Sequence, residues 1–190
     1  MPVIEVHLIE GYTPEAHRRL GEAITDATRL VVPAPAEAIT VMIQELDQTR
    51  YFRGRGLRNP APALPDPCAV VVQFLSCLQE RNLEAAKVLL DNRFQMSFPG
   101  MQPMHCLEDL VEWASTRYRT IAKHIERTEA FGDAEGKTIV YCSGMLSGEW
   151  PDGRPFNNIR FVDRFELVAG LITRQEVWND LAEVRAQAHA

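Results

Sequence analysis

The sequence lacks the features that mark several large classes of protein. Its four cysteines, Cys68, Cys77, Cys106 and Cys142, form no Cys-x-x-Cys pair, so we expect reduced thiols and no zinc site. No apolar run approaches the roughly 18 residues of a membrane span, and residues 1–30 lack the pattern of a secretion signal. The net charge of −6 disfavours nucleic acid and anionic membranes as partners. We therefore expect a cytoplasmic protein without metal or cofactor that acts on a small molecule.

Proline is not scarce, but it is concentrated in one place. Four of the 12 prolines fall within residues 59–67, where they make an extended, semi-rigid spacer. This spacer predicts two domains, residues 1–58 and residues 68–190, joined by the linker 59–67.

The first domain has a simple alternation of patterns. Residues 3–9 are rich in Val, Ile and Leu and predict a strand that ends at Gly11. A helix over 14–31 follows, with Thr13 as its N-cap, and residues 39–46 predict a second strand. Strand, helix and strand at this spacing form a right-handed βαβ unit with parallel strands. A unit of this size is marginal alone, so we expect a homo-oligomer.

Pro2 is the most distinctive residue of the first strand. If Met1 is removed after synthesis, the mature chain begins with a secondary amine held at a strand end. Such an amine can act as a base or as a nucleophile. On residue type alone, the simpler interpretation is that Pro2 only starts the strand.

An arginine-rich segment follows the second predicted strand. Arg50, Arg53, Arg55 and Arg58 lie within nine residues and flank Tyr51. A run of charges is most often a solvated loop. The functional alternative is an anion pocket, because guanidinium groups bind carboxylates in two-point fashion.

Together, the start, spacing and order of residues 2–54 resemble one subunit of the 4-oxalocrotonate tautomerase family. The resemblance implies that Pro2 is the general base that moves a proton alpha to a carbonyl. Tyr12 and Thr40 occupy the positions where that family has its two carboxylate-binding arginines, and Tyr51 matches its aromatic residue. We therefore hypothesise that an arginine of the following loop replaces them, Arg53 first among Arg50, Arg53 and Arg55.

The second domain reads as helices followed by strands, an α+β arrangement. Asp66 and Pro67 begin the first helix. Periodicity predicts helices over 67–79, 82–90 and 107–121, and strands over 93–98, 123–131, 137–148, 158–167 and 171–179.

This order is similar to the nuclear-transport-factor-2-like cone, a cystatin-like fold that includes SnoaL-like polyketide cyclases and ketosteroid isomerase. The resemblance places Asp163 at the position of an oxyanion-binding acid, while Phe74 and Phe98 stand where catalytic partners would be. We expect Tyr141 and Trp178 to line the pocket of this cone as well.

Three functions remain open on the sequence. The first is a tautomerase or isomerase that uses Pro2 on a small keto or enol substrate, with Tyr12, Arg50, Tyr51, Arg53 and Arg55 as substrate-binding residues. The second is a non-enzymatic ligand-binding or assembly protein. The third is cyclase- or hydratase-like chemistry at Asp163. In each case we expect a dimer, trimer or hexamer.

Overall fold

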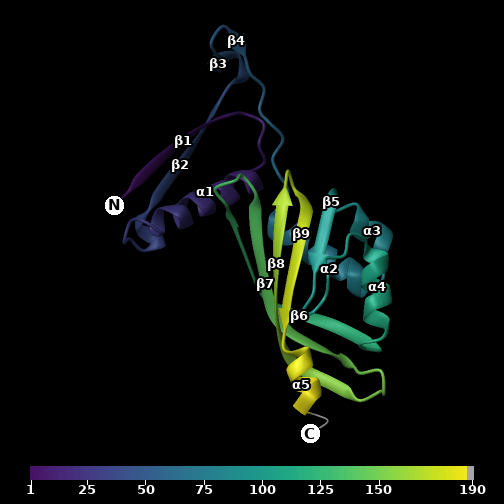
Figure 1. Ribbon diagram of the computed structural model, residues 1–190. Coiled ribbons are helices and arrows are strands. Elements are labelled where there is room, and N and C mark those ends of the chain that lie inside the picture. Colours follow the sequence, from purple (N-terminus) through teal and green to yellow (C-terminus); the bar gives the residue numbers. More distant parts are fainter. Residues whose placement is uncertain (188–190) are drawn as a thin grey trace. The chain divides into compact units, whose positions relative to one another are not determined.

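The chain divides within its proline-rich segment into two units, Met1–Ala63 and Leu64–Ala190, called here the N-terminal and the C-terminal unit. The computed structural model describes residues 1–187 (Figure 1). The last three residues of the predicted second domain, 188–190, lie outside the described residues.

The N-terminal unit is the predicted strand–helix–strand unit. Strand β1 (Val3–Ile9) and strand β2 (Thr40–Leu46) pair in parallel, with Val3 opposite Thr40. Helix α1 (Pro14–Arg29) connects them, and the Thr13 side chain accepts a hydrogen bond from the Ala16 N–H at 3.2 Å. This cap fixes where the helix begins, while its end comes two residues before the predicted position.

A short hairpin that the sequence did not predict follows β2. A 3₁₀ turn (Gln48–Arg50) leads into strands β3 (Phe52–Arg53) and β4 (Gly56–Leu57), which pair antiparallel. Gly54 takes a φ of 65° in the turn, a conformation that favours glycine. Strands of two residues are too short to leave an alternating pattern, so only a loop was expected here.

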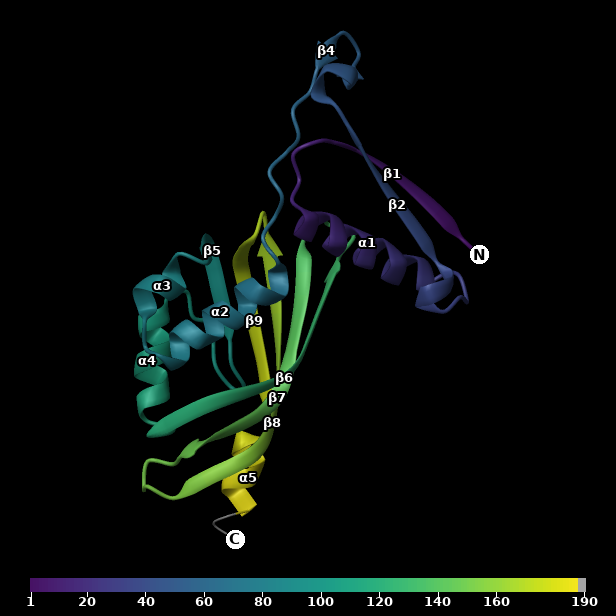
Figure 2. The ribbon, with the colours of Figure 1, turned by 180° about the vertical axis from the view of Figure 1, so that it is seen from behind.

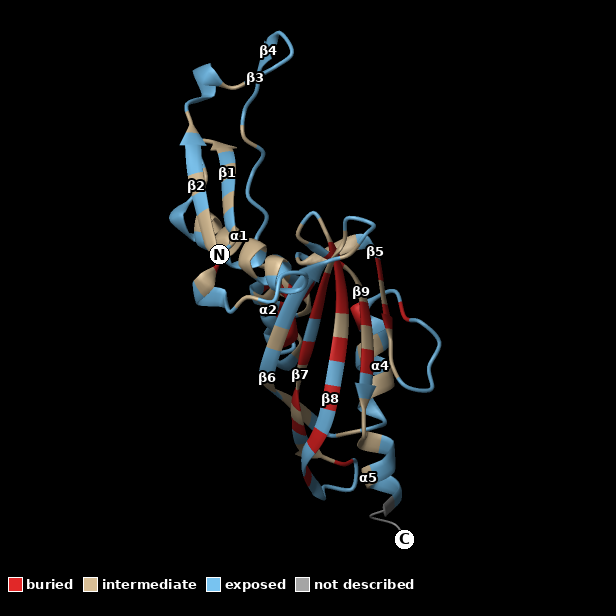
Figure 3. Cartoon of the chain, turned by 90° about the vertical axis from the view of Figure 1, so that its left-hand side faces the viewer, coloured by how far each residue is buried: buried red, intermediate tan, exposed pale blue. Residues whose placement is uncertain are grey.

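Burial in the N-terminal unit is sparse (Figure 3). Among its 63 residues, all of which the structure describes, Ile39 alone is buried, and α1 has no buried residue. Several large apolar side chains are more than two-fifths exposed, namely Val3, Leu30, Val31, Met42, Phe52 and Leu57.

The C-terminal unit contains the predicted helices with small changes in length. Helix α2 (Pro67–Gln79) starts where Asp66 accepts hydrogen bonds from two backbone N–H groups, and α3 (Leu83–Lys87) is a single short turn. Helix α4 (Leu107–Ser115) ends six residues earlier than predicted, because the chain enters a strand at residue 120. A last helix, α5 (Leu181–Gln187), was not predicted.

A five-stranded sheet forms the rest of the unit and confirms the α+β prediction. Its strands are β5 (Leu90–Ser97), β6 (Thr120–Gly132), β7 (Thr138–Glu149), β8 (Pro155–Val168) and β9 (Leu171–Asn179). They lie in the order β5-β9-β8-β7-β6, with β5 parallel to β9 and the other pairs antiparallel. Helices α2, α3 and α4 gather on one face of the curved sheet (Figure 2).

The core of the C-terminal unit lies between these helices and that face of the sheet. Phe74 of α2 packs edge-on against Phe94 and Phe165, with ring centroids 6.1 Å apart in both pairs. Phe74 and Phe165 have no exposed surface. Aromatic packing of this kind holds α2 against the middle of the sheet.

Candidate functional site

Pro2 lies at the free end of β1. Its carbonyl oxygen accepts a hydrogen bond from the Thr40 N–H at 3.0 Å, which fixes the start of the strand against β2. Pro2 itself is half-buried, while Met1 is 90% exposed. Removal of Met1 would therefore leave a secondary amine on a fixed backbone with an open side toward solvent.

The predicted substrate-binding residues lie at the other end of the same unit. Because β1 and β2 are parallel, Ile9 and Leu46 end side by side, and the segments that follow both strands begin there. A strand of seven residues spans about 20 Å at about 3.3 Å per residue. Figures 1 and 2 show the chain start and the β3–β4 hairpin at opposite ends of this unit. One chain therefore does not bring Pro2 together with Tyr12, Arg50, Tyr51, Arg53 or Arg55.

Tyr12 belongs to a small polar group at this far end. Its ring centroid lies 6.4 Å from that of His17, and the His17 Nε2 is 3.3 Å from the Glu45 Oε1. Arg50, Arg53 and Arg55 are exposed, and none of them forms an ion pair with another described residue. Their guanidinium groups are thus available to an anion.

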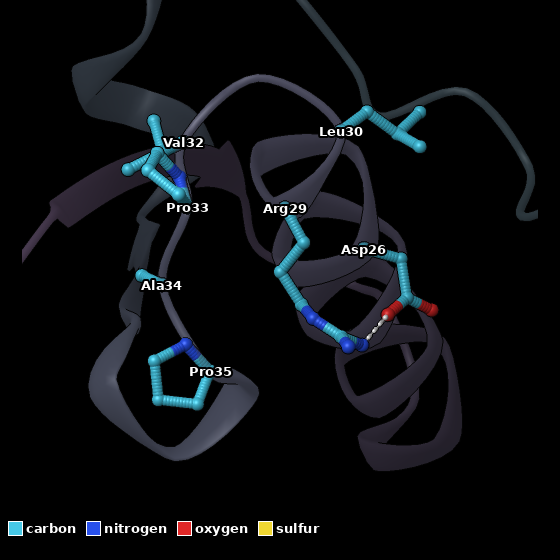
Figure 4. Close-up of a pocket in the computed structure, with 7 residues that line it drawn as sticks. All are labelled: Asp26, Arg29, Leu30, Val32, Pro33, Ala34 and Pro35. Atoms are coloured by element: carbon cyan, nitrogen blue, oxygen red, sulfur yellow. Dashed lines mark ion pairs between the residues drawn. The ribbon is translucent and has the colours of Figure 1, made fainter.

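One cation does lie at the end of the unit that carries Pro2. Arg29 ends α1, which runs antiparallel to the strands, and it lines an open hollow of about 520 Å³ (Figure 4). Its Nη1 is 3.5 Å from the Asp26 Oδ1. The sequence analysis did not consider Arg29, because a basic residue in a last helical turn is explained by the helix dipole alone. The hollow is lined by Asp26, Arg29, Leu30, Val32, Pro33, Ala34 and Pro35.

The C-terminal unit encloses a second candidate site, a cavity of about 310 Å³ between α2, α4 and the sheet. Most of its lining is apolar or aromatic. The main apolar side chains are Leu75, Leu78, Leu83, Phe98, Leu110, Trp113, Tyr118, Ile121, Leu146, Phe161 and Val177.

The floor of this cavity carries a compact polar group. Lys123 forms an ion pair with Asp163, and the Gln175 Nε2 donates to the same carboxylate oxygen at 3.0 Å. Asp163 is fully buried, and Gln175 is 2% exposed. The Lys123 Nζ also lies 4.4 Å from the centroid of the Phe161 ring, so its charge meets both a carboxylate and an aromatic face.

The pKa of the neighbouring Cys142 thiol is raised in this environment. Burial, together with the negative charge of Asp163, raises the pKa of Cys142 to about 12, and Lys123 opposes part of that shift. Cys142 therefore stays a neutral thiol and packs as a small apolar residue rather than as a nucleophile.

The five residues predicted for this pocket have different outcomes. Phe98 lines the cavity, Asp163 lies directly behind Lys123 and Gln175, and Phe74 belongs to the core instead. The prediction was wrong for Tyr141 and Trp178, which are 36% and 51% exposed and lie on the opposite face of the sheet. The reason is the two-residue alternation of a strand: Cys142 and Val177, their buried neighbours, point inward instead.

Lys123, Gln175 and Trp113 were missed by sequence reasoning. Gln175 could have been found, because a polar residue in phase with buried Val177 is an anomaly on an apolar face. Among the described residues, no cluster of His, Cys, Asp and Glu side chains could hold a metal ion, and no helix is long and apolar enough to cross a membrane.

Comparison with known proteins gives separate results for the two units. The profile of a family described as "Tautomerase enzyme" matches residues 2–57. A protein named "Probable tautomerase" from Lactiplantibacillus plantarum is 35% identical over 63 residues, which cover 33% of this chain and 98% of that protein. The 2-hydroxymuconate tautomerase of Bacillus subtilis strain 168 is 37% identical over 51 residues, 27% of this chain and 82% of that enzyme.

Solved structures resemble the rest of the chain in fold. An NTF2-like protein from Burkholderia thailandensis E264 is 18% identical with a TM-score of 0.52, over 67% of this chain and 99% of that one. A protein described as a SnoaL-like polyketide cyclase from Jannaschia sp. CCS1 is 15% identical with a TM-score of 0.52, over 67% and 94% of the two chains. The C-terminal unit thus has the nuclear-transport-factor-2-like fold. By the match of its N-terminal unit, the chain belongs to the tautomerase family.

Proposed function

We propose that this protein is an isomerase that moves a proton alpha to a carbonyl, with Pro2 as its general base once Met1 is removed. The observation that carries the proposal is the position of Pro2 in a tautomerase-family unit. Its carbonyl is held by Thr40 while the adjoining Met1 is exposed. A rigid backbone holds the base in one place, as proton transfer requires.

In the proposed reaction, the lone pair of the Pro2 nitrogen takes a proton from an acidic C–H or enol O–H of the substrate. From a C–H, the electrons of that bond move into the adjacent carbonyl and give an enolate; loss of the proton from an enol O–H gives the same kind of enolate directly, with the charge on oxygen. The protonated amine then returns the proton to a different atom, so that substrate and product are isomers. A guanidinium group near the enolate oxygen stabilises the negative charge that develops there.

The substrate-binding cation, we propose, comes from a second copy of the chain. Pro2 and the arginine-rich hairpin lie at opposite ends of one unit, so Arg53 can meet a substrate at Pro2 only across an interface. The exposed apolar side chains of the unit favour such an assembly, as does its single buried residue. A small 2-keto acid or its enol fits this combination of an amine and a carboxylate-binding arginine.

The test uses tag-free protein whose N-terminus is verified by mass spectrometry, with ketonisation of the enol of phenylpyruvate as the reaction. We expect Pro2→Ala to lower kcat/KM by about 100-fold or more, since a positioned base contributes about 10²–10⁴ in rate. The proposal fails if Met1 is retained in active protein, or if Pro2→Ala turns over at the wild-type rate.

Arg53→Ala and Arg29→Ala form a matched pair for the binding cation. If a neighbouring copy supplies it, Arg53→Ala raises KM for the acidic substrate by about tenfold, and Arg29→Ala leaves KM unchanged. The reverse result would place the carboxylate beside the Arg29 of the same chain and would remove the role of the second copy. The KM values of Arg50→Ala and Arg55→Ala show how much each of these two arginines contributes to binding of the acidic substrate.

A non-enzymatic, ligand-binding role is the second candidate for the C-terminal unit. The bonds of Asp163 to Lys123 and Gln175 favour it over the cyclase- or hydratase-like alternative. These partners hold Asp163 behind the cavity lining, where it is not in reach to move a proton on a bound molecule.

A further inference from the structure

The proline-rich linker is in contact with each unit at one of its prolines. A Cβ added to Gly11 would lie 3.3 Å from the Cγ of Pro60, and both residues belong to the N-terminal unit. A Cβ added to Gly170 would lie 2.8 Å from the Cγ and Cδ of Pro65, and both belong to the C-terminal unit. Nonbonded carbon atoms normally lie about 3.5–4.0 Å apart. Each proline ring therefore occupies the space that a side chain would take on the facing glycine.

The backbone of the two glycines does not by itself account for these contacts. Gly11 follows β1 with a φ of 122°, and Gly170 lies between β8 and β9 with a φ of 86°. Both conformations favour glycine, because a Cβ is disfavoured there. A turn of this kind requires nothing of the surface next to it, yet a linker proline lies against the turn in both units. The same contact at both ends of one linker points to a common role.

A second contact beside each proline fixes the direction in which the linker leaves its unit. On the N-terminal side, the Arg58 N–H donates to the Tyr51 carbonyl oxygen at 3.3 Å, two residues before Pro60. On the C-terminal side, Asp66 follows Pro65 directly, and its side chain caps α2 by accepting from two backbone N–H groups. Two held points along a chain define its direction. The linker therefore has a fixed path up to Pro60 and again from Pro65.

Four residues lie between the two proline contacts, namely Ala61, Pro62, Ala63 and Leu64. All four are exposed and belong to no helix or strand, and the boundary between the two units falls among them, after Ala63. The ring of Pro62 fixes only its own φ, so the other φ and ψ angles of this segment can change. The segment is also short, since the five residue steps from one contact to the other span at most about 18 Å.

We propose that residues 61–64 are the hinge of this protein and that the two proline–glycine contacts are clamps at its ends. The Pro60–Gly11 contact is the N-terminal clamp, and the Pro65–Gly170 contact is the C-terminal clamp. Because both clamps lie outside the hinge, the units can turn while the β3–β4 hairpin and the start of α2 keep their geometry. The hinge acts whether or not Pro2 is a catalytic base.

Distances between pairs of spin labels, measured by pulsed electron paramagnetic resonance on the full chain, test the proposal. Glu22→Cys with Ala61→Cys spans the N-terminal clamp, and Leu64→Cys with Arg127→Cys spans the C-terminal clamp. Glu22→Cys with Arg127→Cys spans the whole hinge. The side chains of Glu22 and Arg127 are 57% and 71% exposed, so labels at these positions do not disturb a core.

The labelling background removes competing thiols and competing distances. Cys68→Ala and Cys106→Ser leave only Cys77 and Cys142, which are buried. An excess of unlabelled chain separates distances within one chain from distances between copies.

We expect a narrow distance distribution across each clamp with the native linker, and a distribution at least about twofold broader across the hinge. Pro60→Gly should broaden the distribution of the N-terminal clamp pair alone, and Pro65→Gly that of the C-terminal clamp pair alone. Pro62→Gly is the matched control. It removes a proline inside the hinge and should leave both clamp pairs narrow.

Three outcomes would overturn the proposal. A distribution across the hinge as narrow as those across the clamps would show that the units do not turn. A broad distribution across either clamp would show that the flexible segment is longer than residues 61–64. Equal broadening of a clamp pair by Pro62→Gly and by the variant of its own clamp would show that chain stiffness, and not contact with glycine, orders the linker. The three prolines are exposed or half-buried, so circular dichroism should show a folded protein for every variant.

Discussion

The two units of this chain differ in how many residues they bury. The N-terminal unit has one buried residue, Ile39, whereas the C-terminal unit has a continuous core around Phe74, Phe165 and Ile172. The unit without a core carries its candidate residues at two separated ends, and the unit with a core encloses its candidate site in a cavity. This contrast fits the proposal that the first site is completed between copies, whereas the lining of the cavity comes from the C-terminal unit alone.

The largest expected difference in stability comes from truncating one phenylalanine in each unit to alanine. Phe165→Ala should lower the free energy of unfolding by about 3–5 kcal/mol, because it leaves a cavity in a closed core. Phe52→Ala, at a side chain that is 59% exposed, should cost less than about 1 kcal/mol. Urea unfolding of both variants measures the difference. A loss at Phe52 as large as that at Phe165 would mean that a neighbouring copy buries the hairpin.

The next largest effect comes from replacing a glycine by alanine in each unit, which should lower the stability of one unit and raise that of the other. A Cβ on Gly144 would lie 2.0 Å from the His124 carbonyl oxygen, so Gly144→Ala should destabilise the sheet by about 1–3 kcal/mol. Gly21, in the middle of α1, has no heavy atom within 4 Å of its added Cβ, so Gly21→Ala should stabilise by about 0.5–1 kcal/mol. Thermal unfolding of the two variants compares them. Destabilisation by Gly21→Ala would indicate that another copy packs against this face of α1.

Dilution should then affect the units differently. If copies complete the N-terminal unit, its stability falls by about 1 kcal/mol per tenfold dilution. The three tryptophans, Trp113, Trp150 and Trp178, all lie in the C-terminal unit, so tryptophan fluorescence follows that unit, while circular dichroism follows both. We expect the midpoint by circular dichroism to fall on dilution more than the fluorescence midpoint. Equal midpoints at all concentrations would contradict an assembly through the N-terminal unit.

The smallest expected effect is electrostatic. Burial of Glu166 raises its pKa, but hydrogen bonds from Arg164 and Lys137 outweigh burial and hold that pKa below its ordinary value. A lowered folded-state pKa contributes stability above the unfolded value, and this contribution is lost as pH falls through the folded pKa. The stability gap between wild type and Glu166→Gln, less than about 1 kcal/mol at pH 6, should therefore close toward pH 3.

Glu15 provides the matched position in the N-terminal unit for this test. A hydrogen bond from Arg18 is the main cause that lowers its pKa as well, but the Glu15 side chain is exposed to solvent. Glu15→Gln should therefore change the pH dependence of unfolding less than Glu166→Gln. A larger effect at Glu15 would indicate that assembly buries it.

Much of the fold was predictable because the residues that start its helices and strands are neighbours in the sequence. The Asp66 side chain and Pro67 set the start of α2, which spans the predicted residues 67–79. The strands β1 and β9 also have the predicted bounds. β1 is rich in apolar residues and ends shortly before Gly11, and β9 begins directly after the turn at Ala169 and Gly170. The β3–β4 hairpin and α5 were missed, because their segments are too short to show a period.

The sites were less predictable than the elements that carry them. Tyr12 and the arginines near residue 53 were expected to join Pro2, yet the parallel pairing of β1 with β2 places them at the far end. Trp178 was assigned to the pocket, although its side chain is on the exposed face. In both cases the residue type indicated a possible role. The sequence did not show at which end of the unit, or on which face of the sheet, the side chain lies.

The sequence by itself determined the two units, most of their helices and strands, and the family of the first, because caps, periodicity and turns act over a few neighbouring residues. Only the tertiary structure decided which residues share a site. Lys123, Asp163 and Gln175 come from three strands, and they meet because the pairing of β6, β7, β8 and β9 fixes which side of the sheet each side chain takes. The contact between Lys123 and Asp163 joins residues 40 positions apart in the chain, which no local pattern specifies.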